Sequence, residues 1–177
     1  MTISRQAAER LALEHGDRLY TFCRRLAFSQ TDADDLYQQT FLRMLDMSGT
    51  INLNHNPAGF LMAVAARIWR DERTKYARRQ RIAPMQYSHT ELHNAAVDLS
   101  IEALVNQKQV QADVRSAVEH LSDTLRIPVL LYYMADLSIN EISKALHIPQ
   151  GTVKRRLHEA RHTLRSQMEG MGYDEQR

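Results

Sequence analysis

The strongest constraint on the fold of this chain is a pair of short helical patterns near its C-terminus. Residues 138–141 read Ser-Ile-Asn-Glu, a capping box in which the first and last side chains satisfy backbone amides at a helix start. The first helix is predicted to end at Leu146, and residues 147–149 form a tight turn. A second helix is predicted from Gln150, and its buried face consists of Val153, Leu157, Ala160 and Leu164. This spacing predicts a helix-turn-helix.

The outer face of the second helix is strongly basic. Long cationic side chains reach DNA phosphates, and side chains in the first turns of such a helix reach base edges in the major groove. The side chains predicted to contact DNA are Gln150, Thr152, Lys154, Arg155, Arg156 and Arg161. The alternative interpretation of the same residues is a helical hairpin whose charged face is merely solvated.

The rest of the chain also shows helical periodicity, and it predicts an all-α protein. One helix is expected over residues 4–28, and a second is expected to begin after Thr31 as its N-cap. A third begins at Pro57, a residue that suits the first turn of a helix. The predicted buried stripe of the second helix contains Ala33, Leu36, Tyr37, Thr40, Phe41, Met44 and Leu45.

The periodicity weakens after the third helix and returns at Val110. We therefore expect two small helical domains, a three-helix-type bundle and a helix-turn-helix domain, joined by a flexible linker. The predicted boundaries are residues 1–81, 82–108 and 109–177.

Charge is distributed unevenly along the chain, although its formal net value is only +2. Residues 57–81 contain seven Lys or Arg against two acids, whereas residues 82–122 contain two against five. Residues 150–166 contain five against one. Two separated basic segments favour two contacts with a polyanion, although a basic run is often only a solvated helix face.

Four blocks of this sequence, in order, resemble the extracytoplasmic-function sigma factors, which are promoter-specificity subunits of bacterial RNA polymerase. Residues 141–164, EISKALHIPQGTVKRRLHEARHTL, are similar to the domain that binds the −35 promoter element. Residues 121–138 resemble the segment that leads into it. Residues 32–45, DADDLYQQTFLRML, resemble the polymerase-docking segment, and residues 56–81 resemble the helix that melts and reads the −10 element.

The resemblance implies roles for particular residues. It assigns Asp34, Asp35, Gln38 and Phe41 to docking on core polymerase. Without the resemblance, these acids are better explained as charges that stabilise the start of their own helix. The −10 set implied by the resemblance combines a base-capturing loop with a basic helix, and consists of Ser48, Asn52, Asn54, Asn56, Arg67, Arg70, Arg73 and Lys75.

The sequence departs from the family pattern at three places. Ser143 stands where Ala is usual, and His147 stands where the turn has Gly. A His in that turn would need a left-handed conformation at a cost of about 1 kcal/mol. Ala66-Arg67 replaces the Arg-Asn pair that is common before the basic run. The linker of about 25 residues leaves no space for the middle domain of housekeeping sigma factors.

The resemblance also implies partners, namely core RNA polymerase, promoter DNA and an anti-sigma factor. We expect a cytoplasmic protein without membrane insertion, because no apolar run approaches the ~18 residues of a membrane span. Cys23 is the only cysteine, and its apolar neighbours predict a buried residue more strongly than a redox switch. No cofactor is expected, no catalytic motif is present, and an enzyme is not predicted.

Two rival interpretations remain open from the sequence. A dimeric helix-turn-helix regulator that replaces no polymerase subunit would explain the C-terminal half equally well. It would not explain the acidic-faced helix and the basic helix in the N-terminal half. A metal protein would use the pairs His89/His93 or His158/His162, which have i, i+4 spacing, but no Cys or carboxylate partner stands at suitable spacing. Solvated histidines and no metal site are therefore predicted.

Overall fold

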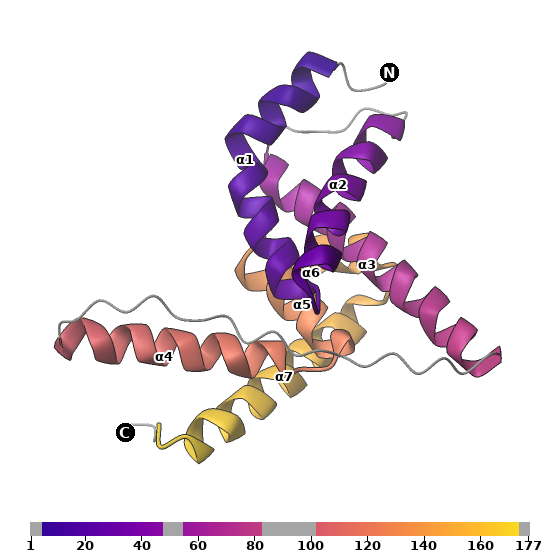
Figure 1. Cartoon of the computed structure of the whole chain (residues 1–177). Helices are drawn as coiled ribbons and strands as arrows, with labels where there is room; N and C mark the ends of the chain where they lie inside the picture. The colour runs from indigo at the N-terminus through magenta and orange to yellow at the C-terminus, as the bar shows by residue number, and fades with distance from the viewer. Residues whose placement is uncertain (1–4, 48–54, 83–101, 174–177) are drawn as a thin grey trace.

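The computed structural model describes residues 5–47, 55–82 and 102–173 of the chain. Within these ranges the secondary structure is α-helical, with no strand, as predicted (Figure 1). The helices are α1 (Arg5–Leu26), α2 (Gln30–Asp46), α3 (Pro57–Ile82), α4 (Glu102–Glu119), α5 (Asp123–Tyr133), α6 (Ile139–Leu146) and α7 (Gln150–Gly170).

The first three helices pack against one another, and in the stripe predicted for α2 the residues Tyr37, Phe41 and Leu45 are half-buried. In α2, Ala33, Leu36, Thr40 and Met44 are all buried. The hydroxyl of Thr40 remains satisfied because it donates to the carbonyl oxygen of Leu36 at 2.7 Å. In α3, Leu61, Ala65 and Trp69 are buried, so Trp69 belongs to the core rather than to an exposed stacking surface.

The start of α2 differs from the prediction. The N-cap is Ser29 and not Thr31, because the Ser29 hydroxyl accepts a hydrogen bond from the amide of Asp32 at 3.1 Å. The same hydroxyl donates to the Asp32 carboxylate at 2.8 Å. This reciprocal pair starts the helix at Gln30, two residues before the predicted first turn.

Helix α4 begins at Glu102, before the point at which the periodicity became clear at Val110. It contacts α7, and both helices extend from the centre toward the same side of the molecule (Figure 1). Tyr173 donates its hydroxyl to the Asp113 carboxylate at 2.7 Å, which fixes the end of α7 beside α4. Residues 83–101 of the predicted linker lie outside the described ranges.

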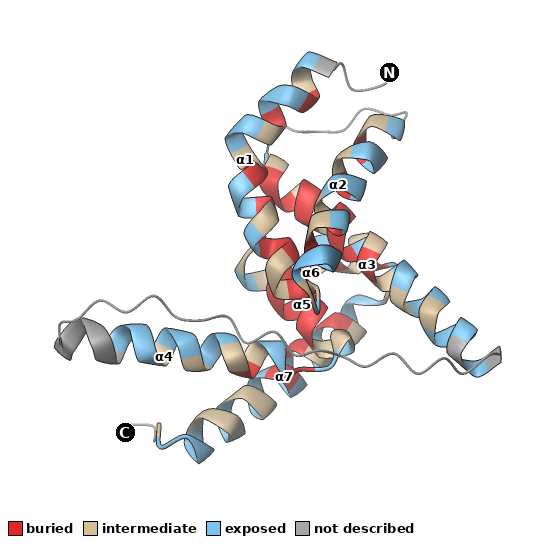
Figure 2. Cartoon of the chain, viewed as in Figure 1, coloured by how far each residue is buried: buried red, intermediate tan, exposed pale blue. Residues whose placement is uncertain are grey.

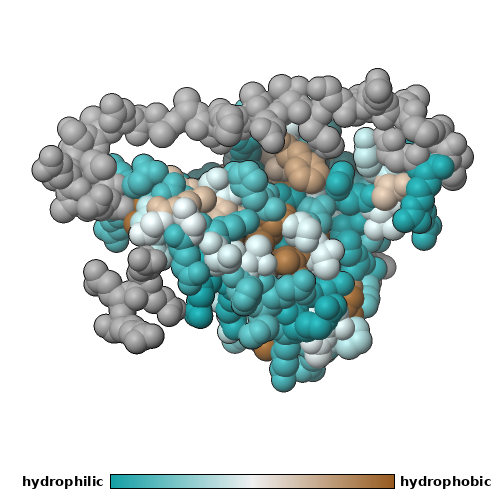
Figure 3. Space-filling model, turned by 90° about the horizontal axis from the view of Figure 1, so that it is seen from below, coloured by the Kyte–Doolittle hydropathy of each residue, from teal (hydrophilic) through white to brown (hydrophobic). Residues whose placement is uncertain are grey.

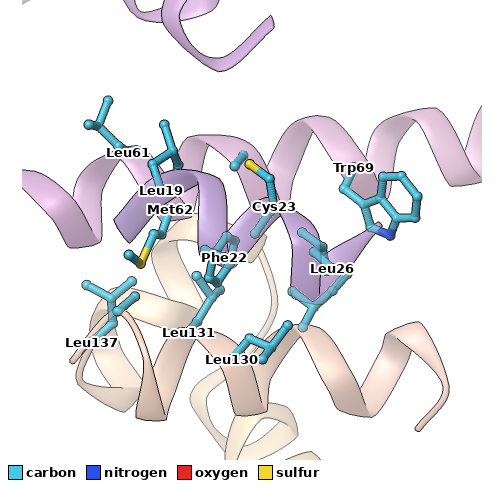
Figure 4. Close-up of a cluster of buried hydrophobic side chains, with 14 of the residues drawn as sticks. Leu19, Phe22, Cys23, Leu26, Leu61, Met62, Trp69, Leu130, Leu131 and Leu137 are labelled. Atoms are coloured by element: carbon cyan, nitrogen blue, oxygen red, sulfur yellow. The ribbon is translucent and has the colours of Figure 1, made fainter. Parts of the chain in front are cut away.

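The N-terminal and C-terminal helices share one hydrophobic core. Leu130 and Leu131 of α5 lie against Phe22 and Leu26 of α1 in the same buried cluster (Figure 4). Figure 2 shows buried residues concentrated where the helices converge, while the outer parts of α3 and α7 carry exposed and half-buried residues. The face seen in Figure 3 is mainly hydrophilic wherever it is described, with small hydrophobic groups. No helix among the described residues is long and apolar enough to cross a membrane.

Candidate functional site

Helices α6 and α7 form the predicted helix-turn-helix. The capping box is present, because the Ser138 amide donates to the Glu141 carboxylate at 2.8 Å and the Glu141 amide donates to the Ser138 hydroxyl at 3.3 Å. The Ser138 hydroxyl also donates to the Glu141 carboxylate, at 2.6 Å. The hydrogen bonds that this carboxylate accepts, first from the Ser138 hydroxyl and then from its amide, hold the pKa of Glu141 below its usual value. The cap therefore fixes where α6 starts relative to the preceding helix.

The turn between α6 and α7 adopts the conformation that the sequence indicated. His147 lies in the left-handed region with φ 50° and ψ 47°, which a glycine would occupy without strain. The Ser143 hydroxyl donates to the carbonyl oxygen of Ile148 at 2.6 Å. Ser143 and His147, which account for two of the departures from the family pattern, therefore both contribute to this turn, and the serine adds a hydrogen bond that an alanine would lack.

The beginning of α7 presents an exposed polar face. Gln150, Lys154 and Arg155 are exposed, and Thr152 is half-buried. Gln150 donates to the side chain of Asn140 at 3.2 Å, which links the two helices of the motif. These side chains project from one stable helix, as insertion into the major groove requires.

Arg156 and Arg161 complete the side chains of α7 that are predicted to contact DNA, and both contact or face other helices. Arg161 is exposed, and its Nε donates to the Tyr133 hydroxyl at 3.0 Å. Arg156 is half-buried and lines a groove that also contains Arg70 and Arg73 of α3. Arg156 therefore faces the N-terminal half, unlike its exposed neighbour Arg155.

The predicted polymerase-docking residues lie on α2, with different exposures. Asp35 and Gln38 are exposed, whereas Asp34 accepts a hydrogen bond from the Tyr20 hydroxyl at 2.7 Å. Phe41 is half-buried and packs edge-on against the Tyr37 ring, with 5.2 Å between the ring centroids. Sequence reasoning missed Leu42, whose surface is 62% exposed. Its position outside the buried stripe of α2, at i+4 from Gln38, was the available signal.

The loop assigned to base capture is described only at its end. Ser48, Asn52 and Asn54 lie outside the described residues. Asn56 caps α3, because its side-chain oxygen accepts from the Gly59 amide at 2.8 Å. Its side-chain nitrogen donates to the carbonyl oxygen of Ala135, also at 2.8 Å. In this arrangement Asn56 therefore joins the two halves of the chain.

The basic residues of α3 divide into two groups. Arg67 is exposed, and Lys75 is exposed and pairs with Glu72 at 3.0 Å. Arg70 instead donates to the carbonyl oxygen of Leu146 in α6. Arg73 forms an ion pair with Asp123 of α5 at 3.2 Å. Two of the four cations predicted to contact −10 DNA are thus held by the C-terminal half.

Cys23 is fully buried in α1, in agreement with its predicted structural role. Burial raises the pKa of its thiol to about 12, so a thiolate is rare at neutral pH. Among the described residues, no three His, Cys, Asp or Glu side chains form a group that could hold a metal ion. His158 and His162 are both exposed on α7.

Comparisons with known proteins cover both halves of the chain. The family described as Sigma-70 region 2 matches residues 11–80, and the family described as Sigma-70, region 4 matches residues 111–164. The ECF RNA polymerase sigma factor SigE of Mycolicibacterium smegmatis is 30% identical over 161 residues. That match covers 89% of this chain but 60% of the relative's length. The ECF RNA polymerase sigma factor SigW of Bacillus subtilis is 26% identical, over 86% of this chain and 83% of the relative.

Two solved structures share the fold. The sigma factor RpoE of Bartonella quintana, crystallised in complex with the anti-sigma factor NepR, superposes with a TM-score of 0.70 at 18% identity. The match covers 91% of this chain and 96% of that one. CnrH, in complex with the cytosolic domain of CnrY, superposes with a TM-score of 0.59 at 18% identity, over 95% and 91% of the two chains.

Proposed function

Because the chain belongs to the extracytoplasmic-function group of the sigma-70 family, we propose that it binds core RNA polymerase and directs it to specific promoters as an alternative sigma factor. The observation that carries this proposal is the combination of two surfaces in one chain. One is the polar face of α7, presented by a capped helix-turn-helix. The other is the exposed face of α2, which lies in the region 2 match. A DNA-binding regulator alone needs only the first.

In this proposal residues 1–81 dock on polymerase and contact the −10 element, residues 82–108 link the two parts, and residues 109–177 bind the −35 element. Gln150, Thr152, Lys154 and Arg155 contact bases and phosphates in the major groove. The link raises the effective concentration of each part at its own site without adding contacts. Phosphodiester chemistry remains with the polymerase, so the chain acts without catalysis, in the cytoplasm.

The docking surface that we propose consists of Asp35, Gln38 and Leu42. These residues are exposed and follow one another at helical spacings of three and four, so they share one face of α2. Asp34 supports this surface through its hydrogen bond with Tyr20 rather than by direct contact. An exposed leucine flanked by polar side chains is typical of an interface core with a polar rim.

Contacts with the −10 element need a rearrangement of the described structure. Arg67 and Lys75 are exposed and available to phosphates, whereas Arg73 must first leave Asp123 and Arg70 must leave Leu146. We infer that the two halves separate when the chain joins polymerase and promoter. An anti-sigma factor is the further partner that we propose, because the sigma factor RpoE of Bartonella quintana, which shares this fold, was crystallised in complex with the anti-sigma factor NepR.

Size-exclusion chromatography with purified bacterial core polymerase tests the proposal. The full chain should co-elute with core polymerase and should not bind a promoter duplex tightly when it is alone. A stable dimer that binds a palindromic operator without polymerase would instead support the rival regulator.

A further inference from the structure

A groove of about 430 Å³ lies between α3, α5 and the start of α7. Five arginines line it: Arg70, Arg73, Arg78, Arg81 and Arg156. Four come from α3 and the fifth comes from α7, so the groove exists only while the two halves of the chain are packed together. Asp123 is the only carboxylate residue among those that line it.

The charges of this groove are incompletely balanced. Arg70 pairs with Asp71, and Arg73 pairs with Asp123. Asp123 also accepts a hydrogen bond from Arg126, so its charge is shared between two guanidinium groups. Within the described part of the chain, Arg78, Arg81 and Arg156 form no ion pair, although the nearby carboxylate of Glu159 partly offsets the charge of Arg156.

Among the arginines of this groove, Arg156 has the least favourable surroundings for its charge. Its Nε atom is buried and has no hydrogen-bond partner among the described residues. Burial, and then the neighbouring charges of Arg155 and Arg70, lower the pKa of its guanidinium. An anion in the groove would reduce the repulsion between the guanidinium groups that line it.

The chemistry of the lining identifies the class of ligand. Guanidinium groups bind phosphate oxygens through paired hydrogen bonds, and several of them converge here. The volume falls within the range of roughly 300–1,000 Å³ that is usual for small-molecule sites. Ile127, Pro128 and Leu146 add an apolar wall on which a base could lie. A single phosphate would leave part of the charge unmatched, whereas a triphosphate carries enough negative charge for all three unpaired arginines.

We propose that this groove binds a linear polyphosphate, either inorganic or as part of a nucleotide, and that the ligand holds the two halves of the chain together. The binding itself does not depend on the proposed role in transcription. If that role is correct, the ligand would compete with promoter DNA, because Arg70 and Arg73 belong to both sites.

Isothermal titration calorimetry on the full chain tests this proposal, with inorganic tripolyphosphate and GTP as separate probes. At about 0.15 M salt, where charges beyond roughly 8 Å are screened, we expect saturable binding of one ligand per chain. Arg156→Ala and Arg78→Ala should each weaken it roughly tenfold, as expected for the loss of one charge-assisted contact. Tighter binding of GTP would assign the apolar wall to the base, and equal binding would assign the site to the phosphate chain alone.

Two matched variants separate a built site from general charge attraction. Arg155→Ala and Arg79→Ala remove the same charge from the adjacent positions of the same helices, and neither residue lines the groove. Both should change the affinity less than about twofold. Arg78 is exposed, so its variant keeps the fold even if Arg156→Ala does not. Absence of saturable binding, or equal weakening by Arg78→Ala and Arg79→Ala, would overturn the proposal. Association with core polymerase is measured separately and without polyphosphate. A negative calorimetric result would therefore not count against the proposed role in transcription.

Discussion

Arg73 of α3 lies 3.2 Å from the carboxylate of Asp123 in α5, and this ion pair joins the two halves of the chain. Asp123 also binds Arg126, whose residue surface is only 3% exposed. The ring of Phe28 lies under both guanidinium groups, 4.6 Å from that of Arg73 and 5.1 Å from that of Arg126. One carboxylate and one ring thus organise two cations at the junction.

The first prediction concerns the unequal importance of the two partners in this ion pair. Asp123→Ala should lower the free energy of unfolding by about 1–3 kcal/mol, because it leaves the buried Arg126 without its carboxylate. Arg73→Ala should cost less, about 0.5–1 kcal/mol, because Arg73 is partly exposed and solvent screens its charge. Urea unfolding measures both variants, with Arg79→Ala as the exposed control. Equal losses for the two variants would contradict the shared role of Asp123.

The second prediction concerns the proposed docking surface on α2. Leu42→Ala should weaken association with core polymerase by about 1–2 kcal/mol, roughly tenfold in affinity, because an apolar side chain at an interface centre is lost. Leu13→Ala is the matched control, since Leu13 is 88% exposed on α1. Neither substitution should change the melting temperature appreciably, because neither side chain is buried. Similar affinities for the two variants would place the docking surface elsewhere.

The third prediction uses the left-handed turn of the helix-turn-helix. His147→Gly should raise the free energy of unfolding by about 1 kcal/mol, because glycine adopts this backbone conformation without steric conflict. Ala145→Gly, in the preceding helical turn, should lower it by a similar amount of about 1 kcal/mol. Thermal unfolding distinguishes the two variants, because the melting temperature should rise in His147→Gly and fall in Ala145→Gly. Destabilisation by both substitutions would mean that the His147 side chain makes a contribution larger than its backbone strain.

The fourth prediction concerns pH and the capping box. The pKa of Glu141 is lower in the folded chain than in the unfolded chain, so its carboxylate contributes stability above the unfolded-state pKa. That contribution is lost as the pH falls through the lowered folded-state value. Glu141→Gln should therefore be less stable than the parent chain at pH 7, by at most about 1 kcal/mol. The difference should shrink below about pH 4.

Denaturant titrations at a series of pH values would measure this convergence. Glu169→Gln, an exposed substitution near the end of α7, serves as the control and should follow the parent chain throughout. A difference that stays constant down to pH 3 would show that the Glu141 charge does not contribute to the cap.

Local sequence patterns predicted the parts of the fold that depend on neighbouring residues. The capping box at Ser138 and the left-handed His147 follow from side-chain chemistry within a few positions, and both are confirmed. The start of α2 was missed because Ser29 and Thr31 are both competent caps. The choice between them rests on the reciprocal hydrogen bonds of Ser29 with Asp32, which residue type alone does not reveal.

The junction between the halves could not be predicted, for a different reason. Arg73 and Asp123 are separated by 50 positions, and helical periodicity describes only which face of a helix is apolar. In the sequence the arginines of α3 are indistinguishable from a solvated basic face. Only the packing of α3 against α5 and α6 shows that Arg70 and Arg73 bind groups of the C-terminal half while Arg67 is exposed.

The central claim, that this chain confers promoter specificity on polymerase, is tested most directly by run-off transcription with purified core enzyme. We predict transcripts that start at defined promoters only when the chain is present. Arg155→Ala should reduce transcripts that depend on the −35 element while leaving co-elution with core polymerase intact. No promoter-dependent transcript from any genomic template, or equal loss of transcription and polymerase binding in Arg155→Ala, would contradict the account.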